Sequence, residues 1–137
     1  MPRLSQWFIK LAFIYMLAGF TLGALLLGHK GQPFHPALWN WLPAHYEWLL
    51  MGFVAQLTLG MAFWITPRFW KPPRRGNTTG AYVAIVLLNA GILLASLGPV
   101  FWATITPWAL VIGRALEAGA AVAFAHAIFP RVVGREG

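Results

Sequence analysis

Four apolar runs, each close to 20 residues long, dominate this sequence of 137 residues. They cover approximately residues 7–27, 44–66, 81–101 and 107–129. An α-helix needs about 20 apolar residues to cross the hydrocarbon core of a bilayer. Only 9% of the residues are charged, against about 25% in a soluble domain. The sequence therefore predicts an all-α integral membrane protein with a single transmembrane domain, residues 1–137.

The segments between the four runs predict a bundle of alternating, up-and-down transmembrane helices. Pro43 and Pro107 stand at the expected first turn of a helix, where proline is tolerated. Pro67 ends the second run, and residues 68–80 have the composition of a polar loop. Because the number of crossings is even, both termini are expected on the same side of the membrane.

The basic residues indicate which side that is. Cytoplasmic segments of membrane proteins carry an excess of Lys and Arg. On the far side only Lys30 lies outside a span, whereas the side of the termini has Arg3, Lys10, Arg68, Lys71, Arg74, Arg75, Arg131 and Arg135. We expect both termini to be cytoplasmic, in the plasma (inner) membrane of a bacterium or archaeon. The net charge of +7 lies at the membrane edges and therefore does not indicate nucleic-acid binding.

The composition excludes several kinds of site. The chain has no cysteine, which excludes disulfides, cysteine-ligated zinc and iron–sulfur clusters. Its three acidic residues are too few for a calcium site built from carboxylates.

Polar side chains inside the spans are costly and each needs a reason. Gln56, Asn89 and Glu117 fall near the centres of the second, third and fourth runs, at 1.5 Å per residue. They predict a hydrogen-bonded layer in the interior of the bundle, and Arg114 is spaced to pair with Glu117. Such a layer either fixes the helix register or takes part in a proton relay or cofactor contact.

The fourth run is rich in small residues, which let helices approach closely. They are Ala115, Ala118, Gly119, Ala120, Ala121, Ala123 and Ala125. This face predicts contact with other helices and favours a homo-oligomer.

The histidines are candidate ligands for a cofactor. His45 opens the second span, and Gly52 and Gln56 follow on its helical stripe, which would leave room for a flat macrocycle. His29 lies at the outer end of the first span, whereas His126 lies near the opposite face of the membrane. His45 and His126 therefore cannot bind the same haem.

The residues around and after His45 resemble a known family. They read PAHYEWLLMGF at positions 43–53, continued by Gly60 and by TPRF at 66–69. This pattern resembles the second helix of small four-helix membrane proteins related to subunit I of haem–copper oxidases. C-type cytochrome c oxidases and bacterial nitric oxide reductases have a comparable helix, whose histidine is an axial ligand of the low-spin haem b. The resemblance implies that His45 is an axial ligand of haem b. Glu47 stands where family members often have a second histidine.

Three functions follow from these observations. The first is a haem b-binding protein for electron transfer or diatomic-gas binding, with His29, a symmetry-related histidine or an open position opposite His45. Its redox partner or gas is not identified by the sequence. The second is a haem-free accessory or assembly subunit, and the third is a proton or solute pathway through Glu117, Gln56 and Asn89. A complete oxidase or reductase is not expected, because the chain lacks the histidines of a binuclear copper site.

The charge bias predicts the outcome of a topology experiment. Reporters fused after Gly137 or inserted near Gly76 should be cytoplasmic, and one inserted near Gln32 should be external, because eight basic residues flank one side and one flanks the other. Paired alkaline phosphatase and green fluorescent protein fusions measure this. An external reporter at Gly137 would contradict the expected orientation.

Overall fold

The computed structural model describes residues 1–101 and 106–133, so Arg135 lies outside the described part of the chain. Helix α1 comprises Arg3–Gly31. The second span is built from a 3₁₀ turn η1 (Pro36–Trp41), α2 (Leu42–Glu47), a π-helical segment η2 (Trp48–Ala55) and α3 (Gln56–Ile65). Helices α4 (Thr79–Phe101) and α5 (Thr106–Val132) complete the fold.

The four predicted spans are confirmed as helices long and apolar enough to cross a membrane. They comprise Arg3–Gly31, Pro36–Ile65, Thr79–Phe101 and Thr106–Val132. The helices match their apolar runs closely: the second span ends at Ile65, one residue before the end of its run, and α1 is longer than its run at both ends. The extra turns carry boundary residues such as Arg3 and Lys30.

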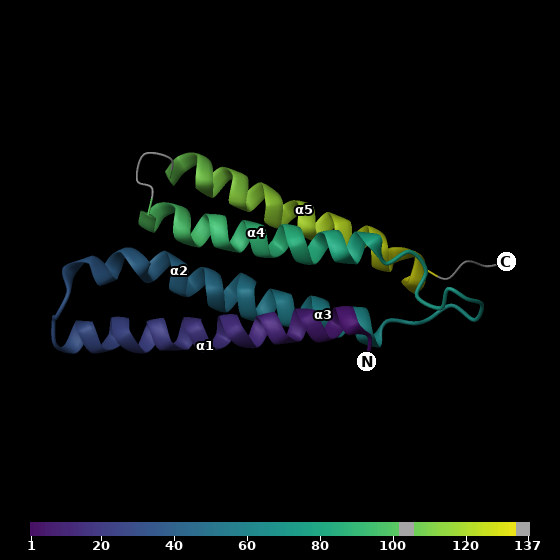
Figure 1. The fold of residues 1–137 in the computed structure, drawn as a ribbon, viewed down its shortest axis with the longest axis horizontal. Coiled ribbons are helices and arrows are strands. Elements are labelled where there is room, and N and C mark those ends of the chain that lie inside the picture. Colours follow the sequence, from purple (N-terminus) through teal and green to yellow (C-terminus); the bar gives the residue numbers. More distant parts are fainter. Residues whose placement is uncertain (102–105, 134–137) are drawn as a thin grey trace.

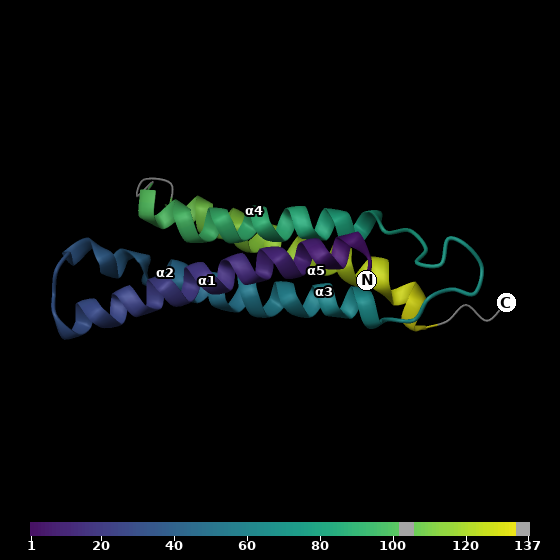
Figure 2. The same cartoon turned by 60° about the horizontal axis from the view of Figure 1, so that its bottom comes forward.

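The helices form two antiparallel hairpins that lie against each other (Figure 1). One hairpin pairs α1 with the second span, and the other pairs α4 with α5. Successive spans run in opposite directions, which brings the start of α1, the segment 66–78 and the end of α5 to one end of the molecule (Figures 1 and 2). We call this the basic end, because it holds Arg3, Arg68, Lys71, Arg74, Arg75 and Arg131.

Glycines allow α1 and the second span to pack closely. A Cβ atom at Gly52 would lie 2.5 Å from Cγ of Tyr15, and one at Gly60 would lie 2.6 Å from Cβ of Phe8. Without a hydrophobic force between helices in lipid, small residues at the interface gain van der Waals contact through close approach. The stripe that contains Gly52 therefore faces α1.

The second hairpin packs in the same way. A Cβ atom at Gly91 would lie 2.7 Å from the carbonyl oxygen of Gly113, and one at Gly113 would lie 2.9 Å from Cβ of Ala95. Gly113 is not among the small residues named above from the sequence; of those, Ala120 is fully buried. Other small residues of α5, including Ala115 and Ala118, are exposed.

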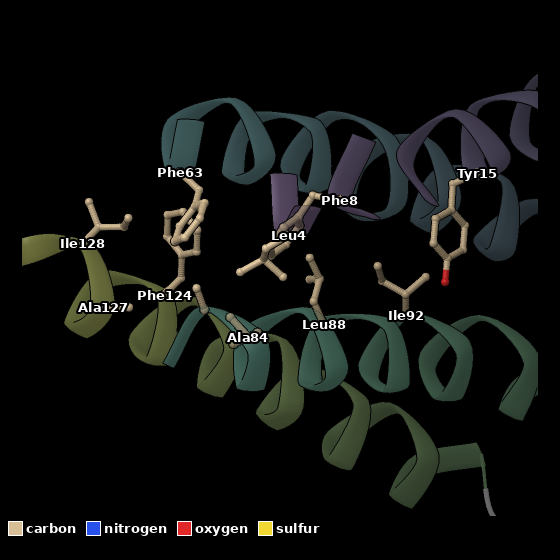
Figure 3. Packing of buried hydrophobic residues seen from close by; sticks show 12 residues of the cluster. Leu4, Phe8, Tyr15, Phe63, Ala84, Leu88, Ile92, Phe124, Ala127 and Ile128 are labelled. Carbon is tan, nitrogen blue, oxygen red and sulfur yellow. The ribbon is translucent and has the colours of Figure 1, made fainter. Parts of the chain in front are cut away.

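A hydrophobic core joins the two hairpins. Phe8 of α1 meets Phe124 of α5 edge-to-face, with 6.1 Å between the ring centroids. Figure 3 shows these rings together with Phe63, Leu88 and Ile92 in the space between the helices. This core lies nearer the basic end, and a second, smaller hydrophobic cluster, which contains Leu22, Leu26 and Ala44, lies toward the opposite end.

Candidate functional site

His45 lies at the start of the second span and packs against α1. Its Nδ1 atom is 2.9 Å from the carbonyl oxygen of Gly19. A carbonyl oxygen can only accept, so Nδ1 carries the proton and the neutral ring has its lone pair on Nε2. Gly23 makes room for the imidazole, because a Cβ atom there would lie 2.5 Å from Cε1 of His45.

This arrangement fits a haem ligand in its chemistry. Histidines that bind metals commonly donate their other ring N–H to a backbone carbonyl, which fixes the ring and its tautomer. The Gly19 carbonyl does this for His45. In the neutral, half-buried ring, this hydrogen bond selects the tautomer whose Nε2 lone pair can bind iron.

The rest of the predicted haem surface is packed differently from our expectation. The Tyr15 ring lies directly against Gly52, where room for a macrocycle was expected. Gln56 is fully buried, and neither atom of its amide has a hydrogen-bond partner. In this structure, Gly52 serves the packing of two helices, so a haem site here depends on His45 rather than on the stripe.

His29 has a different role from His45. Its Nδ1 accepts hydrogen bonds from the backbone N–H groups of Phe34 and His35, at 3.0 and 3.3 Å. The buried ring also meets Phe34 and Trp39 edge-to-face. His29 thus closes the turn after α1, and it lies six residues beyond Gly23, about 9 Å along the helix axis. The structure does not bring it to His45.

A cluster of three charged side chains joins α5 to the second span. Nη1 of Arg114 donates to Oε2 of Glu117 at 2.8 Å, which confirms the spacing-based prediction of this pair. Nη2 of Arg114 is 2.6 Å from Oε2 of Glu47. We call these three residues the Glu–Arg–Glu cluster. It links two helices through Glu47 and Arg114, which are 67 positions apart in the sequence.

The Glu–Arg–Glu cluster contains two carboxyl groups and a single guanidinium group. Both glutamate side chains are buried, with 6% and 5% exposed, whereas 54% of the Arg114 side chain is exposed. The second carboxyl oxygen, Oε1, of both Glu47 and Glu117 is buried without a hydrogen-bond partner. Fully ionised, the cluster has a charge of −1, and a proton on one carboxyl group would make it neutral.

The predicted interior layer of Gln56, Asn89 and Glu117 does not form. The Asn89 amide donates to the carbonyl oxygen of Ile85 in its own helix, at 2.7 Å. It lines a groove of about 540 Å³ between α1 and α4, whereas Glu117 lines a cavity of about 250 Å³ between α5 and the second span. The three residues fall near the centres of their spans in the sequence, but none of them is hydrogen-bonded to another of the three.

Glu47 is the residue of this site that the sequence reasoning missed. In the sequence, Glu47 stands out only as a departure from the oxidase-like pattern, which often has a histidine at this position. A charged side chain inside a span needs a partner of opposite charge. Arg114 is the cation within the predicted spans that could pair with Glu47 as well as with Glu117. The signal was therefore available in the composition, because Glu47 is the one other acidic residue within a predicted span.

No protein-family model, curated protein or solved structure matches this chain. Its class therefore follows from the fold alone. The four apolar helices indicate a multi-pass membrane protein. Within the described residues, no group of three or more His, Asp or Glu side chains could hold a metal ion.

The Glu–Arg–Glu cluster predicts an order of stabilities. Arg114→Ala should lower the free energy of unfolding by about 3 kcal/mol, because it leaves two buried carboxyl groups without a cation. Glu117→Gln should cost only about 1 kcal/mol, because the amide still accepts a hydrogen bond and Glu47 still pairs with Arg114. Thermal unfolding in mild detergent measures both. Equal or reversed effects would show that the cluster does not hold the helices together.

Proposed function

We propose that this chain binds haem b in the membrane, with His45 as an axial ligand of the iron. The observation that carries the proposal is the hydrogen bond from Nδ1 of His45 to the Gly19 carbonyl oxygen. The resemblance of residues 43–69 to the haem-binding helix of haem–copper oxidases supports it independently. Bound haem b would supply reversible one-electron transfer or a coordination position for a diatomic gas.

The residues around His45 prepare it for this role. Gly19 orients the ring and places its proton on Nδ1, and Gly23 leaves space for the ring beside α1. Glu47 follows two positions later, and its carboxylate contacts Arg114 of α5. Because this carboxylate is paired with the Arg114 guanidinium, it does not compete with His45 for the iron. The position opposite His45 is open, or is filled by a symmetry-related histidine or, after a change in its loop, by His29.

The Glu–Arg–Glu cluster favours a second candidate function, which is proton handling. Two buried carboxyl groups share one guanidinium, and each has an oxygen without a partner. A single proton shared by the carboxyl groups would neutralise the cluster, and its release or uptake would move charge within the membrane. In this reading, the chain is a haem-free proton pathway or an accessory subunit that supplies such a group.

The placement of the chain in its membrane is also a proposal. The positive-inside rule puts the basic end in the cytoplasm of a bacterial or archaeal cell. We propose a homo-oligomer that uses the exposed small residues of α5, such as Ala115, Ala118 and Ala121. The half-exposed Arg114 lies on the same helix, and cover by a second subunit would shield it from lipid.

A set of variants tests the haem proposal through the absorption spectrum of the purified protein. Protein expressed with sufficient haem should copurify with non-covalent haem b, because the chain has no cysteine for covalent attachment. His45→Ala should abolish the Soret band, whereas His126→Ala should leave it intact. Gly23→Ala should weaken haem binding by about 10-fold or more, because its methyl group displaces the imidazole that Gly19 orients.

Gly28→Ala is the matched control for Gly23→Ala. It adds the same methyl group to the same helix, at a position with no other atom within 4 Å. Circular dichroism and size-exclusion chromatography show that each variant is folded. Full haem content in folded His45→Ala would refute the proposal, as would wild-type protein without haem from a haem-supplied host. A change from six- to five-coordinate spectra in His29→Ala would identify His29 as the second ligand.

A further inference from the structure

The basic end holds two arginines, Arg75 and Arg131, that both contact Phe63 at the end of α3. Nη1 of Arg75 and Nη2 of Arg131 both donate to the carbonyl oxygen of Phe63, at 2.9 and 3.2 Å. Their guanidinium groups also lie over the Phe63 ring, with Cζ 5.4 and 5.1 Å from its centroid. Two like charges are therefore held side by side at the end of α3.

These charges exceed what the helix end can balance. Arg131 also donates to the carbonyl oxygens of Pro67 and Thr66, at 2.9 and 2.8 Å. The carboxyl end of a helix carries only about half a negative charge. Burial, and then the charge of Arg68, lower the pKa of Arg75 below its usual value. A positive charge of more than one unit thus remains at this end of the chain.

Among the described residues, no carboxylate lies near enough to neutralise it. Glu47 and Glu117 are the acidic residues in that part of the chain. Each is 14 or more residues from the basic end along its own helix, which corresponds to about 20 Å or more. The third acidic residue, Glu136, lies outside the described residues. The arginines therefore face a space without a described counter-charge.

That space is a cavity with an unsatisfied donor at its wall. A cavity of about 770 Å³ lies between the segment 67–76 and the end of α5, and its lining includes Arg68, Lys71 and Arg131. A smaller cavity of about 110 Å³ lies beside it, lined by Arg75, Arg131 and His126 among others. Only 4% of Arg131 is exposed, and its Nη1 atom has no hydrogen-bond partner.

We propose that the basic end binds the phosphate group of an anionic phospholipid, between Arg68, Arg75 and Arg131. Guanidinium groups bind phosphate oxygens through charge-assisted hydrogen bonds, and basic pockets at helix ends hold lipid headgroups. Apolar side chains of the lining suit the rest of a lipid, because Phe69 and Trp70 line the larger cavity and Trp70 is 100% exposed. The excess positive charge selects a headgroup with a net negative charge.

The test compares neighbouring arginines in the full chain. Arg75→Gln and Arg74→Gln remove the same charge from the same segment, but Arg74 lines neither cavity. Native mass spectrometry, after exchange into detergent with phosphatidylglycerol or phosphatidylcholine of matched acyl chains, measures the lipid that is retained. We expect wild-type protein and Arg74→Gln to retain phosphatidylglycerol, and Arg75→Gln to bind it about five-fold more weakly.

A second variant covers the case in which Arg75→Gln unfolds. The hydrogen bonds to the end of α3 come from Arg75 and Arg131, so Arg68→Gln removes a cavity charge without removing these bonds. It should weaken phosphatidylglycerol binding to a similar extent. Equal retention of phosphatidylcholine, or equal weakening by Arg74→Gln, would overturn the proposal. So would full displacement of phosphatidylglycerol by the same concentration of inorganic phosphate, which would identify a site for the free anion.

Discussion

The ion pair between Arg114 and Glu47 fixes how the two hairpins meet. It joins α5 to the second span. Charges in a bilayer are tolerated when they are paired within the protein, so α5 cannot rotate without breaking this contact. Arg131 makes a second attachment about 25 Å along the same helix, on the carbonyl oxygens at the end of α3. Between these points, α5 packs mainly on α4.

The second span therefore has different partners on its two sides. One side carries His45, Gly52 and Gly60, all of which pack against α1. Glu47 is instead paired with Arg114 of α5, and Trp48 donates to the hydroxyl oxygen of Ser96 in α4 at 3.1 Å. The π-helical segment begins directly after Glu47. π-Helical turns are rare and often occur at functional sites, and here the segment separates the histidine end of the span from α3.

The sequence was sufficient for the spans and for contacts within one helix. The thickness of the bilayer sets the length and hydropathy of each span, so both can be recognised in the sequence. The pair of Arg114 and Glu117 follows from helical spacing alone. Contacts between spans were harder to predict, because depth does not say which face of a helix a residue occupies. Asn89 and Gln56 both fall near the centres of their spans in the sequence, but the Asn89 amide bonds to its own helix and the Gln56 amide has no partner. The link to Glu47 depends on the rotation of α5, which sequence spacing cannot supply.

A double-mutant cycle on Glu47 and Arg114 tests the central claim most directly. The free energy of unfolding would be measured in mixed micelles for wild type, Glu47→Gln, Arg114→Gln and the double variant. Direct contact within a buried pair predicts a coupling energy of about 1 kcal/mol or more, with the double variant less destabilised than the sum of the single changes. Strictly additive effects would mean that Arg114 and Glu47 do not interact, and would contradict this arrangement of the two hairpins.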